Sequence, residues 1–312
     1  MIDQQENRLI SNLHTEQRNP KSIGITGLPV MDMLKIINEE DQTVALCVKD
    51  ALPQIADAVT LLEKRMRSGG RMVYVGAGTS GRLGIMDAAE CGPTYGVNNI
   101  HCIIAGGHDA VFKAQEVMED HTDCAVDDLE AFGLTADDVV IAAAASGRTP
   151  YCIGALEYAK SLGAGRISIS CNPDSTLSRY ADVGIEVDTG AEVIMGSTRM
   201  KAASAQKMIM NMLSTTVMIR LDRTYDNLMV HIQARNQKAD NRMLRLFLEA
   251  AESRDAEFAK HTLAQTKGDL ALAVFMALSG CPLQKAEQVL QRHGGNIQAA
   301  LTFYHKTKAD VC

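Results

Sequence analysis

Two short segments rich in glycine and hydroxyl side chains offer the clearest chemistry in this sequence. One is Gly76-Ala77-Gly78-Thr79-Ser80-Gly81-Arg82, and the other is Ser146-Gly147-Arg148-Thr149-Pro150. Each follows an apolar run, at 71–75 and at 139–144. A strand, a tight glycine turn and a helix start form a phosphate cradle, because turn N–H groups and the helix N-terminus attract an anion. Two such segments on one sheet predict an anionic ligand held from two sides.

A third segment with hydroxyl side chains, Gly196-Ser197-Thr198-Arg199-Met200-Lys201, precedes a long apolar stretch. Ser197 or Thr198 is well placed to cap a helix there, and capping favours the same residue types as phosphate binding. Both roles can hold at once. The candidate substrate- and phosphate-binding residues are Gly78, Thr79, Ser80, Gly81, Arg82, Ser146, Gly147, Arg148, Thr149, Ser197, Thr198 and Lys201.

Carboxylates are the other side chains with chemical potential. Glu90 stands among apolar or small residues, which would raise its pKa and help it act as an acid. Glu119 lies beside other acidic residues, and by composition this group is a solvated helix face. Nothing in the spacing singles out Glu119. The histidines at 101, 108 and 121 lack the spacing of metal ligands, so no metal site is expected.

A dinucleotide site is the alternative for the first glycine segment, since Gly76-x-Gly78-x-x-Gly81 matches that fingerprint. The fingerprint also requires an acidic residue at the end of the second strand, where Asp109 is the only candidate. A dinucleotide fold leaves the second Ser-Gly-Arg segment unexplained, so a compact phosphate is favoured.

Alternating strands and helices must position these segments. The apolar pattern predicts strands at about 71–76, 99–105, 138–144, 166–171 and 183–187, and helices at about 80–91, 109–121, 149–162 and 197–221. This alternation predicts an α/β fold, with a doubly wound parallel sheet of five strands covered on both faces. In the order 2-1-3-4-5, the first and third strands are neighbours where their following loops diverge, which is where ligands bind.

The remaining chain predicts helical parts on either side of that domain. Residues 13–29 form an extended arm, and helical spacing at 30–67 is broken at Pro53. We expect an N-terminal part at 1–60, the sheet domain at 61–225 and a helical region at 226–312 with a three-helix bundle at about 268–306. The long apolar helix near 208–219 is expected in the core or at a subunit interface.

Bulk composition excludes several classes of partner. The net charge of −7 argues against nucleic acid and anionic membranes. The start of the chain is polar and acidic, unlike a signal peptide, and the longest apolar run, at 139–145, is too short to cross a bilayer. Eight scattered cysteines fit free thiols in a reducing cytoplasm.

Longer motifs resemble one known family. They include Gly76–Gly84 running into Asp87-Ala88-Ala89-Glu90-Cys91, Ala145–Tyr151, Gly196–Ala202 and Thr15-Glu16-x-Arg18-Asn19. Over nearly the whole chain the sequence is similar to the N-acetylmuramic acid 6-phosphate etherases, members of the sugar isomerase (SIS) superfamily. The last segment resembles the family's small bundle of ubiquitin-associated (UBA) shape.

This resemblance implies cleavage of the D-lactyl ether of N-acetylmuramic acid 6-phosphate to N-acetylglucosamine 6-phosphate and D-lactate. It implies Glu90 as the acid for the leaving lactate oxygen and Glu119 as the base at C2, with no cofactor. It also implies a homodimer, a small sugar-phosphate substrate and a role in recycling peptidoglycan amino sugar. Gly92, Ala191 and His231 depart from the family's usual residues.

Two other functions remain open on the same fold. A sugar-phosphate sensor such as the glucokinase regulatory protein binds without catalysis, although such a protein has a much longer chain. An aldose–ketose isomerase would abstract the same C2 proton and release no lactate.

Overall fold

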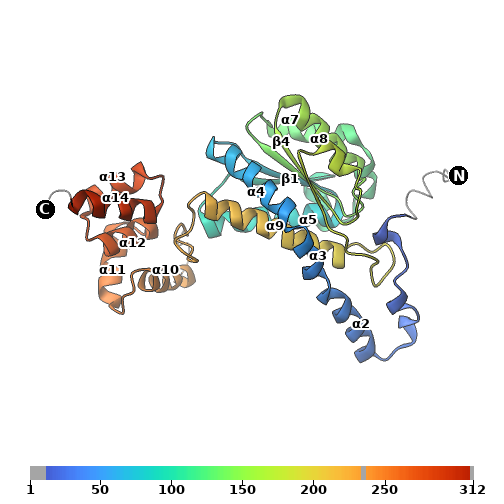
Figure 1. Ribbon diagram of the computed structural model, residues 1–312, viewed down its shortest axis with the longest axis horizontal. Coiled ribbons are helices and arrows are strands. Elements are labelled where there is room, and N and C mark those ends of the chain that lie inside the picture. Colours follow the sequence, from blue (N-terminus) through green and yellow to red (C-terminus); the bar gives the residue numbers. More distant parts are fainter. Residues whose placement is uncertain (1–11, 233–236, 310–312) are drawn as a thin grey trace. The chain divides into compact units, whose positions relative to one another are not determined.

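The structure, a computed structural model, describes residues 12–232 and 237–309 (Figure 1). Contacts divide the chain into two compact units. The first comprises Met1–Ala89 and Asn99–Val217, and the second comprises Glu90–Asn98 and Met218–Cys312. The first unit thus takes in the helices before the sheet as well as the sheet itself.

Five parallel strands form the centre of the first unit. They are β1 (Met72–Gly76), β2 (Ile100–Ile104), β3 (Val139–Ala143), β4 (Gly165–Ser170) and β5 (Val183–Glu186), in the order β2-β1-β3-β4-β5. Gly76 at the end of β1 pairs with Ile104 of β2 and Ala143 of β3, so these three strands end level. Every residue of β1 and β3 is buried, as expected for parallel strands covered on both faces. The predicted strands and their order are confirmed.

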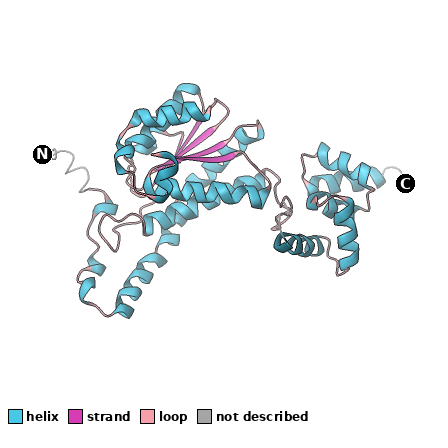
Figure 2. Cartoon of the chain, turned by 180° about the vertical axis from the view of Figure 1, so that it is seen from behind, coloured by secondary structure: helices cyan, strands magenta, loops and turns pink. Residues whose placement is uncertain are grey.

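Helices cover both faces of this sheet (Figure 2). They are α4 (Leu52–Arg67), α5 (Gly78–Tyr95), α6 (Gly107–Phe112), α7 (Thr122–Phe132), α8 (Pro150–Leu162) and α9 (Lys201–Arg220). Val73 and Val75 pack with residues of α7 and α8, whereas the Tyr74 hydroxyl donates to Asp87 on α5 and to the Met210 carbonyl on α9. Successive side chains of β1 thus serve opposite faces.

The segment before the sheet is helical over most of 30–67, as expected, but its breaks lie elsewhere than at Pro53. An arm contains three short 3-10 turns, η1 (His14–Glu16), η2 (Pro20–Ser22) and η3 (Ile25–Gly27), followed by α2 (Val30–Gln42) and α3 (Val44–Asp50). Pro53 does not break the helix, because it lies in the first turn of α4, where a missing N–H costs no hydrogen bond.

The helix predicted at 109–121 is wrong. α6 ends at Phe112, a 3-10 turn η4 covers Glu116–Asp120, and α7 follows from Thr122. Arg82 supplies the physical reason, because its guanidinium donates to the carbonyls of Ala110, Val111 and Lys113. Those carbonyls would otherwise accept the N–H groups of a continuing helix.

The second unit contains five helices within its described residues, together with a core around Phe247 and Phe275. They are α10 (Gln237–Ala250), α11 (Ala256–Gln265), α12 (Leu270–Ser279), α13 (Leu283–Arg292) and α14 (Ile297–Ala309). Asp269 caps α12 by accepting from the Leu272 N–H, and Gly280 ends it with a φ of 66°. The last three helices form the small bundle that the sequence predicts.

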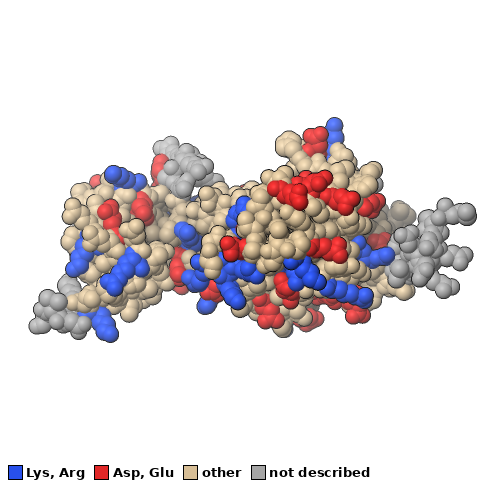
Figure 3. All heavy atoms as spheres, turned by 90° about the horizontal axis from the view of Figure 1, so that it is seen from above, with Lys and Arg blue, Asp and Glu red and all other residues tan. Residues whose placement is uncertain are grey.

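Charged side chains of both signs lie interspersed over the face seen in Figure 3. Within 12–232 and 237–309, no helix combines the length and apolarity that crossing a bilayer requires.

Candidate functional site

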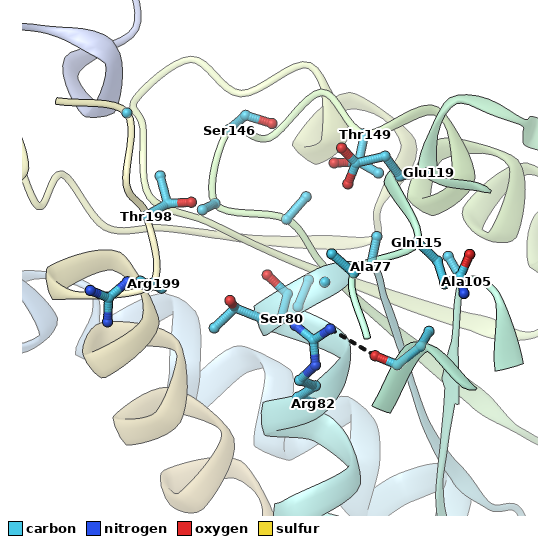
Figure 4. A pocket seen from close by; sticks show the side chains of 18 of the residues that line it. Ala77, Ser80, Arg82, Ala105, Gln115, Glu119, Ser146, Thr149, Thr198 and Arg199 are labelled. Atoms are coloured by element: carbon cyan, nitrogen blue, oxygen red, sulfur yellow. Dashed lines mark hydrogen bonds between the residues drawn. The ribbon is translucent and has the colours of Figure 1, made fainter. Parts of the chain in front are cut away.

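A cavity of 580 Å³ opens beyond the carboxyl ends of β1 and β3, where the sequence predicts the ligand (Figure 4). It is lined by Glu16, Ala77, Gly78, Thr79, Ser80, Arg82, Ala105, Ala110, Ala114, Gln115, Glu119, Ala143, Ala144, Ala145, Ser146, Thr149, Gly196, Thr198 and Arg199. The segments after β1, β2 and β3, the loop at 196–199 and the N-terminal arm therefore contribute to one site.

The first loop turns directly from β1 into α5, and its glycines permit that turn. A Cβ on Gly76 would lie 2.8 Å from the Gly81 nitrogen, and one on Gly81 would lie 2.5 Å from Cγ1 of Ile104. The tight turn brings the first residues of α5, from Gly78 to Ser80, to the cavity. Their backbone N–H groups stand at the start of an 18-residue helix, where no earlier turn supplies carbonyl partners. A helix start of this kind can attract an anion.

The second loop brings Ser146 and Thr149 to the same cavity. Gly147 has a φ of 69°, and a Cβ there would lie 2.2 Å from Oγ of Ser175, so only glycine fits the turn. Thr149 precedes α8, but its side chain makes no capping hydrogen bond. Its hydroxyl at the cavity is therefore not explained by capping.

The third loop differs from the prediction in two respects. α9 begins at Lys201, and the Lys201 and Ala202 N–H groups are capped by the Glu192 carboxylate at 2.9 Å each. The prediction that Ser197 or Thr198 caps this helix is therefore wrong. Burial raises the pKa of Glu192, which is 0% exposed. Thr198 and Arg199 line the cavity on the side opposite Glu119, with the Arg199 guanidinium directed away from the other labelled side chains (Figure 4), whereas Ser197 does not line it.

Lys201 is not at the cavity, contrary to prediction. Its ammonium lies 2.7 Å from Oε2 of Glu40, and both side chains are 5% exposed. Glu40 also accepts from Lys21 at 2.8 Å and from Asn19 at 2.8 Å. Burial alone would raise the pKa of Glu40, but hydrogen bonds from Lys201, Lys21 and Asn19 outweigh it and lower this pKa to about 2. The lysine thus anchors the arm and α2 to α9.

The two arginines predicted to bind substrate have different surroundings. Arg82 lines the cavity, but its guanidinium is engaged with the carbonyls that end α6. Arg148 lines a neighbouring cavity of 450 Å³, which also shares Glu16, Glu119, Ser146 and Thr149 with the first. Gly81 and Gly147 shape the two loops without lining either cavity.

Of the two predicted catalytic glutamates, Glu119 lines the cavity and Glu90 does not. Glu119 lies on η4 and lines both cavities. Glu90 is exposed, lines none of the cavities found in the described part of the chain, and stands twelve residues beyond Gly78 on α5. At about 1.5 Å per residue, this separation is about 18 Å along the helix axis. Within one chain, Glu90 is exposed and therefore lacks the apolar surroundings that the sequence predicts.

Three polar residues of the cavity were not predicted from the sequence: Glu16, Gln115 and Arg199. Glu16 and Arg199 fall within motifs that resemble the etherase family, and this was the only signal for them. Across 12–232 and 237–309, no group of three or more His, Cys, Asp or Glu side chains is arranged to hold a metal ion.

Comparisons with known proteins agree with this architecture. Residues 54–160 match the family model described as the glucokinase regulatory protein N-terminal SIS domain, 117–216 match the SIS domain and 269–309 match a UBA-like domain. The chain is 46% identical over 294 residues to a Mycolicibacterium smegmatis protein named N-acetylmuramic acid 6-phosphate etherase, covering 94% of this chain and 98% of that one. It is 48% identical to N-acetylmuramic acid 6-phosphate etherase 2 of Vibrio parahaemolyticus, again over 94% and 98% of the two chains.

Proposed function

The chain belongs to the N-acetylmuramic acid 6-phosphate etherase family, and we propose that it cleaves the D-lactyl ether of N-acetylmuramic acid 6-phosphate to N-acetylglucosamine 6-phosphate and D-lactate. One observation carries this proposal. A helix-start anion cradle and the Glu119 carboxylate line the same cavity in a chain 46% identical to a named etherase over almost its full length.

The 6-phosphate binds at the start of α5. Backbone N–H groups of Gly78, Thr79 and Ser80 supply donors there, and the hydroxyls of Ser146 and Thr149 approach from the second loop. Thr198 and Arg199 complete the site from the third loop.

Glu119 acts as the base at C2. In the open-chain aldehyde, the C2 proton is acidic because it is α to a carbonyl, so the carboxylate removes it and leaves an enolate with a C1–C2 double bond. The C3–O bond then breaks as the C1 carbonyl re-forms and a C2–C3 double bond appears, and Glu90 gives the departing oxygen a proton to release D-lactate. Water adds at C3 with Glu90 taking its proton, and Glu119 returns a proton to C2. No cofactor takes part.

Glu90 reaches this site from a second copy of the chain. In its own copy, it lies about 18 Å along α5 from the phosphate cradle, too far for both groups to touch one sugar. A homodimer that sets α5 of one copy beside the cavity of the other supplies the acid and an apolar wall around it. Met86 on α5 and Met212 on α9 are 43% and 37% exposed and offer apolar surface on these helices.

We place the enzyme in the cytoplasm, in the recycling of peptidoglycan amino sugar. All seven cysteines in the described ranges are free thiols, which suits a reducing compartment. The substrate is a small sugar phosphate, and a net charge of −7 disfavours nucleic acid as a partner.

The test is D-lactate release from N-acetylmuramic acid 6-phosphate. Wild type releases lactate, and Glu119→Gln lowers kcat by at least about 10²-fold, as expected for a lost general base. Glu130→Gln is the matched control, because Glu130 is exposed on α7 and does not line the cavity. A folded wild type that binds sugar phosphate without releasing lactate would be a sensor. One that converts aldose to ketose instead would be an isomerase.

Mixing two inactive variants tests the second copy. Glu90→Gln and Glu119→Gln are each inactive alone, but mixed dimers contain one intact site if the two residues come from different copies. Activity then recovers to about 25% of wild type, since half the dimers are mixed and one site in each is whole. No recovery after proven subunit exchange would place both residues in one copy.

A further inference from the structure

Glu16 is a carboxylate at the cavity that the proposed reaction has not used. It lies on η1 of the N-terminal arm and lines both the 580 Å³ cavity and its 450 Å³ neighbour. Glu119 lines both as well, whereas Gly78, Thr79 and Ser80 line only the first. Ser146 and Thr149 line both cavities as well, so both carboxylates share with the second loop a part of the site that the start of α5 does not line.

Buried hydrogen bonds hold the arm on either side of Glu16. On one side, Thr15 is 0% exposed; its N–H donates to Oδ1 of Asn172, and its hydroxyl accepts from Nδ2 of Asn172. On the other side, Asn19 is 5% exposed and donates to Glu40 and to the Ala191 carbonyl. These hydrogen bonds on both sides fix the backbone at Glu16, although the arm has little regular structure, so the Glu16 side chain has a defined position.

The third loop accommodates the carboxylate through a glycine. Gly196 has a φ of 76°, and a Cβ built on it would lie 3.1 Å from Oε2 of Glu16. The Glu16 carboxylate is therefore packed against the backbone just before Thr198 and Arg199, on the cavity wall. No hydrogen bond or ion pair from another described side chain engages this carboxylate, so it remains available to a ligand.

We propose that Glu16 is the acid–base group that opens the pyranose ring of the substrate. This inference rests on the proposed function. The C2 proton is acidic only when C1 is a carbonyl, but a hexosamine 6-phosphate exists mainly as a closed hemiacetal, which must open first. C1 and C2 lie at the opposite end of the sugar chain from the phosphate on C6, and the two carboxylates share a part of the site that the start of α5 does not line. Each of the two adjacent proton transfers thus has its own carboxylate.

The ring-opening step balances without a co-reactant. The Glu16 carboxylate takes the proton from the C1 hydroxyl, the C1–O5 bond breaks as the C1 carbonyl forms, and O5 takes the proton from the carboxyl. Glu16 returns to its starting state, and Glu119 is left as a carboxylate for the C2 proton. The step reverses when the product ring closes.

Anomer exchange isolates this step from the elimination. Exchange between the α and β anomers of N-acetylglucosamine 6-phosphate requires ring opening but no chemistry at C2 or C3, and NMR exchange spectroscopy measures its rate. Wild type accelerates it. Glu16→Gln lowers the enzyme-catalysed rate by at least about 10²-fold, and Glu16→Asp restores part of it. Glu39→Gln, the same change at an exposed position on α2, leaves it unchanged.

The outcomes separate the two proposals. If wild type releases no lactate, the proposed function is wrong, whatever the rate of anomer exchange. Wild type that releases lactate but does not accelerate anomer exchange overturns the role of Glu16, as does a Glu16→Gln variant that exchanges at the wild-type rate. Loss of N-acetylglucosamine 6-phosphate binding in Glu16→Gln, measured by calorimetry, also overturns it, because Glu16 would then be a binding group.

Discussion

Replacing Glu40 by glutamine should destabilise the protein in a manner that depends on pH. Glu40 is 4% exposed and accepts hydrogen bonds from Lys201, Lys21 and Asn19. Its pKa falls from the ordinary 4.5 to about 2 on folding. At about 1.4 kcal/mol for each pKa unit, ionised Glu40 stabilises the folded state by about 3 kcal/mol at neutral pH. Removing one partner of a buried ion pair leads to a similar value, about 3–5 kcal/mol, since Lys201 is left buried without a counter-charge.

The direction of the pH dependence follows from the lowered pKa. A carboxyl whose folded pKa is depressed stabilises fully above its unfolded pKa and loses that contribution as pH falls through the folded value. The difference between wild type and Glu40→Gln is therefore complete at pH 7, has dropped to about 1.4 kcal/mol at pH 3 and nearly vanishes toward pH 2. Urea unfolding followed by circular dichroism at pH 7, 5 and 3 measures this difference.

Asp32→Asn is the matched control, because the Asp32–Lys35 pair at 3.0 Å is exposed at 48% and 63%. It should cost less than about 1 kcal/mol. The reasoning fails if Glu40→Gln lies within 1 kcal/mol of wild type at pH 7, a threshold set by the exposed pair. It also fails if the full difference persists at pH 3.

Three further predictions concern the loops and thiols. Gly147→Ala should destabilise by about 1–3 kcal/mol and weaken sugar-phosphate binding, because its Cβ would lie 2.2 Å from Oγ of Ser175; thermal melting and ³¹P NMR measure both effects, and unchanged binding would argue against the cradle. Arg82→Ala should lower kcat but change the free energy of unfolding in urea only a little, because Arg82 donates to the carbonyls that end α6, ahead of Glu119. An unchanged kcat would contradict this positioning role. Cys102 and Cys152 should resist iodoacetamide at pH 8 until the protein is unfolded, because burial raises the pKa of each thiol to about 12 and alkylation requires the thiolate; mass spectrometry after brief labelling would reveal any early modification.

The sheet was predictable because its strands carry their own signal. β1 and β3 are continuous apolar runs, as parallel strands buried on both faces must be. The turns after them were marked in the sequence by their glycines. The structure explains two of these glycines, because a Cβ on Gly81 or Gly147 would collide with a neighbouring atom. From these local features, the sequence places the phosphate cradle at the ends of two neighbouring strands.

The errors arose where distant partners decide the structure. The helix predicted at 109–121 ends early because Arg82, far back in the chain, engages its carbonyls. Lys201 looked like a phosphate ligand beside Thr198, but its partner is Glu40, 161 residues away. Local spacing contains no information on either contact.

The two glutamates proposed as catalytic show a different limit. Neither Glu90 nor Glu119 is singled out by spacing, and both were named by resemblance to the etherases. Glu119 lies at the cavity because η4 replaces the expected helix. Glu16 went unassigned because no periodic pattern marks an arm of 3-10 turns, and its position depends on Asn172 and Glu40 through its neighbours Thr15 and Asn19.

The two ends of α5 then explain why this reaction would require two copies of the chain. A helix start attracts the phosphate through backbone groups that cannot be moved along the chain, so the cradle must lie at Gly78. An acid on the same helix at Glu90 is about 18 Å away, whereas the lactyl oxygen on C3 lies within one sugar ring of the phosphate carbon. A rigid helix cannot close that gap by bending. If the acid comes from a second α5, as we propose, each helix serves two sites at once, and dissociation to single chains is expected to abolish lactate release without displacing any residue of the cradle.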